Sequence, residues 1–120
     1  MLDALREYLM SLGYTDIHID FKPDESEYIA LFKWESVAAS LYDGTANHLI
    51  QLRVCRTDGA EAERLCREIA ELLDSGYNER LIPLPGAGAV IGRIRRLPVL
   101  MDRTENTVTY YAELALWGKA

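Results

Sequence analysis

The 120-residue chain is poor in cysteine and in positive charge, and each shortage excludes a class of protein. Its two cysteines, Cys55 and Cys66, are too few for a disulfide framework, so we expect a reducing compartment. The chain has 13 Lys and Arg residues and 19 Asp and Glu residues, which gives a net charge of -6. That balance argues against an autonomous nucleic-acid-binding protein, whose affinity comes largely from cations that neutralise phosphates.

Long apolar runs are also missing. The longest stretch without a charged side chain, 81–92, has 12 residues, whereas a membrane-spanning helix needs roughly 20. The first residues do not have the basic region followed by an apolar region that a secretory signal needs. What is present, 49% hydrophobic and 27% charged residues, is typical of a packed soluble protein, and we expect one domain over 1–120.

Hydrophobic periodicity predicts two helices. Leucines recur at helical spacing over 2–12, and Gly13 suits the left-handed residue that often ends a helix. In the second helix, Asp58 is a good N-cap, and Glu61 three residues later completes a capping-box-like pair. We expect Gly76 to end this helix. Its apolar stripe consists of Ala62, Leu65, Cys66, Ile69 and Leu73.

Five strands are predicted, over 17–21, 28–34, 48–55, 89–97 and 107–117. We expect a loop over 35–47, a second loop containing Pro83 and Pro85, and a polar turn over 102–106. Pro98 cannot donate a ladder hydrogen bond, so it should end its strand, bulge it or lie at an edge. The order α-β-β-β-α-β-β indicates an α+β fold. It should have a mainly antiparallel sheet of about five strands and two helices on one face.

Few residues have a pattern that chemistry would need. Asp16, His18 and Asp20 alternate on the first predicted strand and together could hold a divalent metal, although the polar side of an exposed strand is the interpretation we favour. The glycine-rich segment 86–92 precedes a strand rather than a helix, so it does not fit a phosphate-binding loop. Cys66 lies in a helical apolar stripe and is expected to be a core residue. We therefore predict no catalytic, cofactor-binding or metal-binding residues, and no enzyme.

Charge is unevenly distributed along the chain. Residues 1–30 hold seven acids and two bases, whereas residues 81–120 hold five bases and three acids. The bases of the later segment include Arg93, Arg95, Arg96 and Arg103. One interpretation is a contact between this basic edge and the acidic surface of a second copy. The alternative is a solvated strand with weak local ion pairs.

Apolar side chains occur on both faces of the strands predicted over 28–34 and 107–117. Two helices, each about 10 Å wide, shield roughly one face of a five-stranded sheet. We therefore expect the other face, which includes Tyr111 and Trp117, to be covered by copies of the same chain. Scattered exposed hydrophobic residues, which all proteins have, are the alternative.

Several segments resemble the minor capsid and tail-terminator (neck) proteins of long-tailed bacteriophages. The similar segments are Tyr42-Asp43-Gly44, residues 50–56, the helix from Ala62 to Leu73, and the closing pair of segments, 98–104 and 109–114. The resemblance implies a virion protein of the tail or neck, assembled in the host cytoplasm. It implies a homo-oligomeric ring, expected to be a hexamer, that caps the tail tube protein and joins it to the head-connector protein. DNA would pass through the ring without specific binding.

By position in that family, the loop around Tyr42 and Asp43 and the arginines Arg93, Arg95 and Arg103 are candidates for contacts with neighbouring subunits or the tube. With the sheet-face residues Tyr111 and Trp117, they form our predicted partner-binding set. An acidic lumen would deny DNA phosphates any binding cations. We expect an acidic surface at the lumen or rim from Asp16, Asp20, Asp24, Glu25 and Glu27.

Two other functions stay open on the sequence. The first is a small-molecule-binding regulatory α+β domain that acts as an oligomer. The second is a small hydrolase or metal enzyme that uses the face formed by Asp16, His18 and Asp20.

Overall fold

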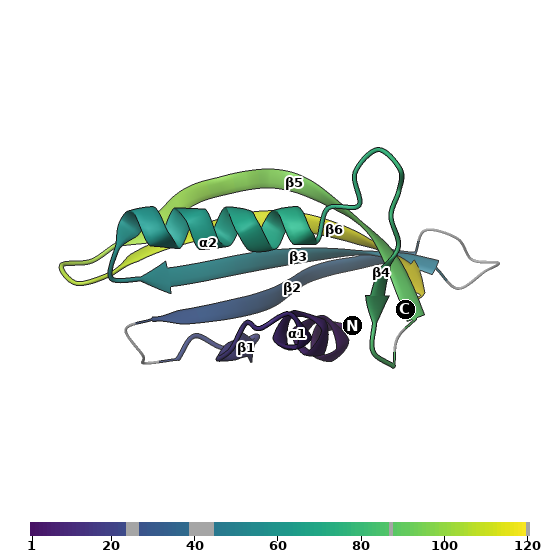
Figure 1. The fold of residues 1–120 in the computed structure, drawn as a ribbon, viewed down its shortest axis with the longest axis horizontal. Coiled ribbons are helices and arrows are strands. Elements are labelled where there is room, and N and C mark those ends of the chain that lie inside the picture. Colours follow the sequence, from purple (N-terminus) through teal and green to yellow (C-terminus); the bar gives the residue numbers. More distant parts are fainter. Residues whose placement is uncertain (24–26, 39–44, 87, 120) are drawn as a thin grey trace.

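The computed structural model describes residues 1–23, 27–38, 45–86 and 88–119, and over these ranges it is an α+β fold with two helices against a six-stranded sheet (Figure 1). The elements are α1 (Leu2–Ser11), β1 (Ile17–Ile19), β2 (Tyr28–Ala38), β3 (Thr45–Arg56), α2 (Gly59–Leu72), β4 (Ile82–Leu84), β5 (Gly88–Arg103) and β6 (Val108–Lys119). The strand order is β1-β2-β3-β6-β5-β4. The pairs are antiparallel, apart from the parallel pair of β1 with β2.

Both helices pack on the same face of the sheet, as predicted. One core cluster joins Leu5 and Leu9 of α1, and Leu65 and Ile69 of α2, to the strand residues of that face. The residues that β1 to β6 contribute to this cluster alternate along each strand that supplies more than one: Ile17, Ile29, Leu31, Ile50, Leu52, Val54, Ile82, Leu84, Val90, Ala112, Leu114 and Leu116. Alternate strand residues share a face, so the opposite set of side chains forms what we term the outer face.

The helix boundaries follow the predicted signals closely. Gly13 follows α1 with φ of 104°, a conformation that glycine adopts without strain. The Asp58 carboxylate accepts a hydrogen bond from the Ala60 backbone N–H at 3.0 Å and so caps α2. The expected capping box is wrong in one detail, because Glu61 instead forms an ion pair with Arg56 at 3.6 Å. Gly76 does not end α2 as expected, because the helix ends at Leu72. Gly76 lies in the turn that follows, with φ of 72°.

There is one strand more than predicted, and the predicted strands are longer than expected, except that β1 ends at Ile19 rather than at residue 21. The loop expected over 35–47 is wrong at both ends, because β2 continues to Ala38 and β3 begins at Thr45. A register shift between Lys33 and Glu35 interrupts the alternation there, which hid the strand from a period-two pattern. β4 was predicted as loop because it contains Pro83; it is a three-residue edge strand, where a residue without an N–H is tolerated.

β5 does not stop at Leu97, as predicted, but continues through Pro98 to Arg103. The register with β6 shifts between Ile94 and Arg96, between Arg96 and Val99, and between Leu100 and Asp102. The expected bulge at Pro98 is therefore present, and the strand runs on past it. The long strands give the molecule extents of 50 × 26 × 25 Å. Neither helix in the described ranges is long and apolar enough to cross a bilayer.

Candidate partner-binding surface

The outward border of β5 is largely uncovered. β6 pairs with one side of this strand, whereas β4 pairs with the other side only at Gly88–Val90. The next backbone groups are bound by the turn after α2: Ser75 Oγ accepts from the Gly92 N–H at 2.9 Å, and an Asp74 carboxylate oxygen accepts from the Ile94 N–H at 3.3 Å. Beyond that point, within the described ranges, only β6 is paired with β5.

We term this remaining segment, residues 95–103, the β5 arm. It combines apolar and basic side chains that are all at the surface or close to it. Leu97 is 52% exposed and Leu100 is 45% exposed. The exposed side chains of the arm are Arg95, Arg96, Leu97, Val99, Leu100, Met101, Asp102 and Arg103. In a regular strand the apolar residues would alternate with polar ones, but three register shifts and an uncovered border leave all four large apolar side chains exposed. Such a patch is typical of a surface that binds another protein.

Two of the predicted partner-binding residues, Arg93 and Trp117, meet on the outer face. They line a hollow of about 430 Å³ together with Asn47, Glu79, Ile91 and Ala115. Arg93 forms an ion pair with Glu79 at 3.4 Å and donates to the Gly92 carbonyl at 3.0 Å. Trp117 is 42% exposed. Tryptophan and arginine are both enriched at protein interfaces, so a partly exposed Trp117 in the same hollow as Arg93 suits a partner contact.

The other predicted partner-binding residues are spread along the sheet. Arg95 and Glu113 both line a small cavity of about 130 Å³, and the ion-pair partner of Glu113 is Arg96, at 3.8 Å. Arg103 is exposed at the end of β5. Tyr111 is half-buried on the outer face, paired in register with Arg53 and Val99. Tyr42 and Asp43 lie outside the described residues. The structure thus brings Arg93 together with Trp117, and it places Arg95 and Arg103 on the β5 arm.

The outer face is less exposed near the start of β2 than the sequence predicted. Tyr28, Ala30 and Cys55 are buried there, with Phe32 packed against them. The guanidinium of Arg53 lies 4.1 Å from the centre of the Phe32 ring and covers it. The predicted apolar surplus of β2 is therefore largely hidden within one copy at Tyr28, Ala30 and Phe32. Four exposed large apolar side chains lie together on the β5 arm instead.

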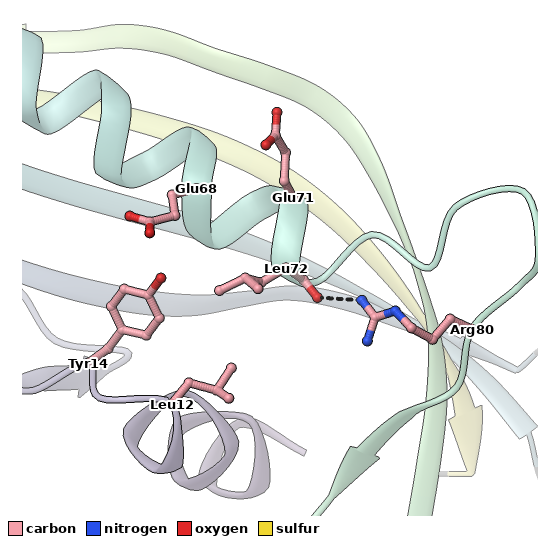
Figure 2. Close-up of a pocket in the computed structure, with 6 residues that line it drawn as sticks. All are labelled: Leu12, Tyr14, Glu68, Glu71, Leu72 and Arg80. Carbon is pink, nitrogen blue, oxygen red and sulfur yellow. Dashed lines mark hydrogen bonds between the residues drawn. The ribbon is translucent and has the colours of Figure 1, made fainter.

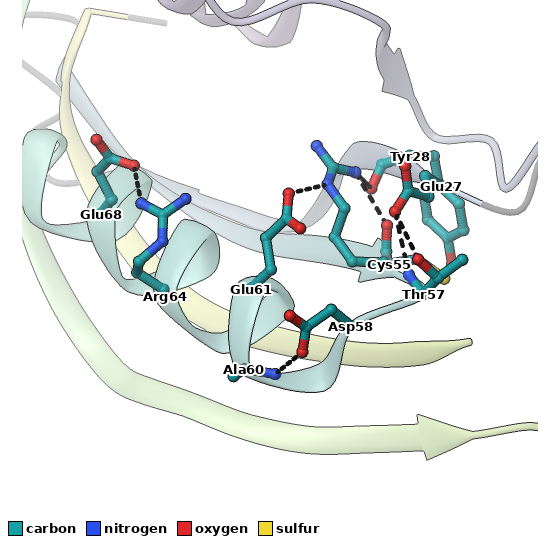
Figure 3. A network of polar contacts seen from close by, with 10 residues as sticks. Glu27, Tyr28, Cys55, Thr57, Asp58, Ala60, Glu61, Arg64 and Glu68 are labelled. Atoms are coloured by element: carbon teal, nitrogen blue, oxygen red, sulfur yellow. Dashed lines mark hydrogen bonds and ion pairs between the residues drawn. The ribbon is translucent and has the colours of Figure 1, made fainter. Parts of the chain in front are cut away.

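The predicted acidic surface is partly engaged in holding the fold together. A Glu27 carboxylate oxygen accepts from the Thr57 backbone N–H at 3.1 Å and from its hydroxyl at 3.3 Å (Figure 3). Beside it, Arg56 donates to the Cys55 carbonyl at 2.9 Å and reaches Glu61 of α2 (Figure 3). Asp16 and Glu27 line a hollow of about 250 Å³ at this end of the sheet. Asp24 and Glu25 lie outside the described residues.

The candidate metal set does not assemble. Asp16 and Asp20 have φ of 56° and 52° and flank β1 rather than alternating along it with His18. An Asp20 carboxylate oxygen accepts from the Lys33 backbone N–H at 3.3 Å. Across the part of the chain that the structure describes, no three His, Cys, Asp or Glu side chains are grouped closely enough to hold a metal ion. The other histidine, His48, is buried in β3, and this burial lowers its pKa.

A groove between the two helices was not predicted. It has a volume of about 470 Å³ and is lined by Leu12, Tyr14, Glu68, Glu71, Leu72 and Arg80 (Figure 2). Arg80 donates to the carbonyl of Leu72 at 3.0 Å, a favourable place for a cation because the C-terminal end of a helix is its negative end. The Tyr14 ring faces Glu68, and partial burial together with this carboxylate raises the pKa of Tyr14. The groove thus has apolar walls and a mainly acidic rim.

Comparison with known proteins adds a likeness of fold. A chain of solved structure matches over 97% of this chain and 94% of its own length, with 14% sequence identity and a TM-score of 0.55. At that identity the shared property is the fold alone. No family model matches the chain, and no curated protein matches it. The function therefore has to be argued from the surface of this molecule.

The sequence did not predict that the apolar residues of the β5 arm are exposed, or that they lie close to the basic residues of the same arm. A signal was present, because the segment 97–101 is an apolar run that begins after Arg95 and Arg96 and ends before Asp102 and Arg103. The predicted strand ended at Leu97, so the apolar residues after Pro98 were not assigned to a strand. Glu79 was missed for another reason: only the turn after α2 brings it to Arg93, 14 residues later in the chain.

The buried thiol of Cys66 gives a direct test of how α2 packs in the core. Burial raises the pKa of the Cys66 thiol to about 12, so the reactive thiolate is almost absent at pH 8. We expect iodoacetamide at pH 8 to alkylate Cys66 only after denaturation, as followed by mass spectrometry of peptides.

Above pH 9 the unfolded chain loses the thiol proton of Cys66 before the folded protein does, so the free energy of unfolding should fall. Rapid labelling of Cys66 in the native protein would contradict its placement in the core.

Proposed function

We propose that this protein is a non-enzymatic virion component that forms a ring at the end of a phage tail. In this proposal it is a tail terminator or neck protein, which caps the tail tube and connects it to the head. Its partners are further copies of itself, expected to form a hexamer, together with the tail tube protein and the head-connector protein. DNA passes through the ring without being bound specifically, and the protein belongs to the virion.

The observation that carries the proposal is the β5 arm. A single copy leaves Leu97, Val99, Leu100 and Met101 exposed on one strand, among Arg95, Arg96 and Arg103. Exposed apolar patches are usually covered when a protein assembles with a partner, and a basic surface binds best to an acidic one. The chain as a whole holds 19 acids against 13 bases, so a second copy offers acidic surface to the arm. Contacts between two different surfaces of identical copies generate rings or filaments.

The acidic side of the molecule also suits passage of DNA. Of the five acidic residues predicted to face the lumen or rim, Asp16, Asp20 and Glu27 lie in or near the segment that leads into β2. Two of these carboxylates are already hydrogen-bonded to backbone N–H groups, Asp20 to Lys33 and Glu27 to Thr57, so the acidic surface is held in place. A wall of ordered carboxylates offers no cations to phosphates, and DNA can slide past it.

The test is to measure the mass of the purified protein and to image it with and without tail tubes. We expect sedimentation velocity to show self-association that increases with concentration. We also expect negative-stain images to show rings, either free or at tube ends, when tail tubes of a long-tailed phage are added. A protein that stays monomeric at high concentration and leaves tube ends bare would contradict the proposal.

A further inference from the structure

The end of the β5 arm and the interhelical groove lie at opposite ends of α2. Residues 99–103 of the arm pair with the start of β6, where Val108 lies beside Gly59, the first residue of α2. The groove lies at the other end, around Leu72, the last residue of α2. The helix has 14 residues, and at 1.5 Å per residue it separates the two features by about 20 Å. The arm therefore cannot fill the groove of its own copy.

The two surfaces are complementary in polarity. The end of the arm presents Leu100 and Met101, which are 45% and 41% exposed, next to Arg103. The groove presents the side chains of Leu12 and Leu72 as apolar walls, with Leu12 46% exposed. Each surface thus has apolar side chains in water that the other could cover. At about 470 Å³ the groove also lies within the range of about 300–1,000 Å³ that binding clefts have.

Their charges are complementary as well. No ion pair within the described ranges involves Arg103 or Glu71. Glu68 pairs with Arg64 at 3.3 Å, but both side chains are about half exposed or more, and such a pair contributes little. Arg80 is directed to the end of α2, where it donates to the Leu72 carbonyl. The rim of the groove is thus open to one further cation, next to Glu71.

Direct strand pairing between copies is the less favourable use of the arm. Pro98 has no N–H to donate, and three register shifts break the hydrogen-bonding border of β5. These are the features by which natural sheets discourage addition of another strand. The arm is therefore better suited to insert its side chains into a cleft than to extend a sheet.

We propose that residues 99–103 of one copy dock in the interhelical groove of the next copy, with Leu100 and Met101 against Leu12 and Leu72, and Arg103 beside Glu71. This contact rests on the proposed function, because it is the joint between neighbouring subunits of the ring. The two surfaces are different and lie far apart on one chain. Each copy therefore offers one arm and one groove, and identical copies join head to tail.

Charge reversal tests the joint by sedimentation velocity on the full chain. Glu71→Arg and Arg103→Glu should each raise the dissociation constant of self-association at least about tenfold, because each places like charges together. The double variant should return to within about threefold of the natural protein, since it restores an opposite pair. Both side chains are exposed, so denaturant unfolding should show that each variant folds. Glu63→Arg on the same helix is the control, because Glu63 lies outside the groove and its ion pair with Arg67 at 3.4 Å joins two half-exposed side chains and contributes little to stability. This variant should leave association unchanged.

Cysteine cross-linking tests the geometry. A Leu12→Cys chain mixed with a Met101→Cys chain should give a disulfide-linked heterodimer on oxidation, whereas Tyr77→Cys, which is fully exposed elsewhere, should not link to Leu12→Cys. Cys55 and Cys66 are buried and should not compete. If self-association persists while the charge variants and the cross-link show no effect, the docking is wrong and the ring proposal stands. If neither the natural protein nor any variant self-associates or binds tube ends, the docking proposal and the ring proposal are both wrong.

Discussion

Replacing Gly92 with alanine is expected to lower the free energy of unfolding by about 3 kcal/mol or more, one of the largest effects that a single methyl group can have. A Cβ at this position would lie 1.8 Å from the backbone carbonyl oxygen of Leu73. The obstacle is main chain rather than the flexible end of a side chain, so it cannot be relieved by a change of rotamer. Denaturant unfolding followed by circular dichroism would measure the loss.

The close approach at Gly92 is part of the joint that places the turn after α2 on β5. Ser75 donates its backbone N–H to the Gly92 carbonyl at 2.8 Å, and its hydroxyl oxygen accepts from the Gly92 N–H at 2.9 Å. The same turn brings Glu79 to Arg93. The variant should therefore loosen both this joint and the outer-face hollow at Trp117.

Gly59→Ala is the matched control for Gly92→Ala. Its Cβ would lie 3.4 Å from a methyl group of Val108, and alanine is favoured in a helix. We expect the free energy of unfolding to change by no more than about 0.5 kcal/mol. If Gly92→Ala were as mild as this control, the contact between the turn and β5 would be wrong.

Leu114→Ala is expected to lower the free energy of unfolding by about 3 kcal/mol, within the range for a buried leucine that leaves a cavity. Leu114 of β6 is fully buried in the core cluster under the helices. It is paired in register with Ile50 on one side and Ile94 on the other. Thermal and denaturant unfolding of the variant would both report the loss.

Leu97→Ala removes the same atoms from the β5 arm and separates folding from association. Because Leu97 is 52% exposed, we expect the free energy of unfolding to change by no more than about 0.5 kcal/mol. Self-association should be weaker, as measured by sedimentation velocity, because an exposed side chain that becomes buried between copies contributes to that contact alone. A loss of stability equal to that of Leu114→Ala would show that the arm is already covered within one copy.

The parts of the fold that could be predicted are those with local signals. The leucine spacing and Gly13 located α1, and Asp58 located the start of α2. The α+β class followed from the order of elements. The missed parts have weak or interrupted signals: β4 is three residues long and contains Pro83, and bulges in β2 and β5 break the alternation of side chains.

The candidate surface was predicted in part. Arg95 and Arg103 were predicted from the basic cluster and from their position in the resembled family, and both are exposed on the β5 arm. Arg93 was also identified, but it is paired with Glu79. The exposure of Leu97, Val99 and Met101 depends on the order of the strands in the sheet, and no local sequence pattern predicts that order. The interhelical groove was missed entirely, because it requires α1 and the end of α2 to be neighbours.

What the sequence determined by itself was the periodicity of its helices and most strands, the segregation of acidic from basic segments, and one set of core side chains. These follow from local spacing and from the cost of leaving apolar side chains in water. The tertiary structure alone decided that β5 would lie near the border with its arm uncovered, and that the groove would form about 20 Å away at the far end of α2. Both depend on contacts between residues far apart in the chain, for which no local preference exists.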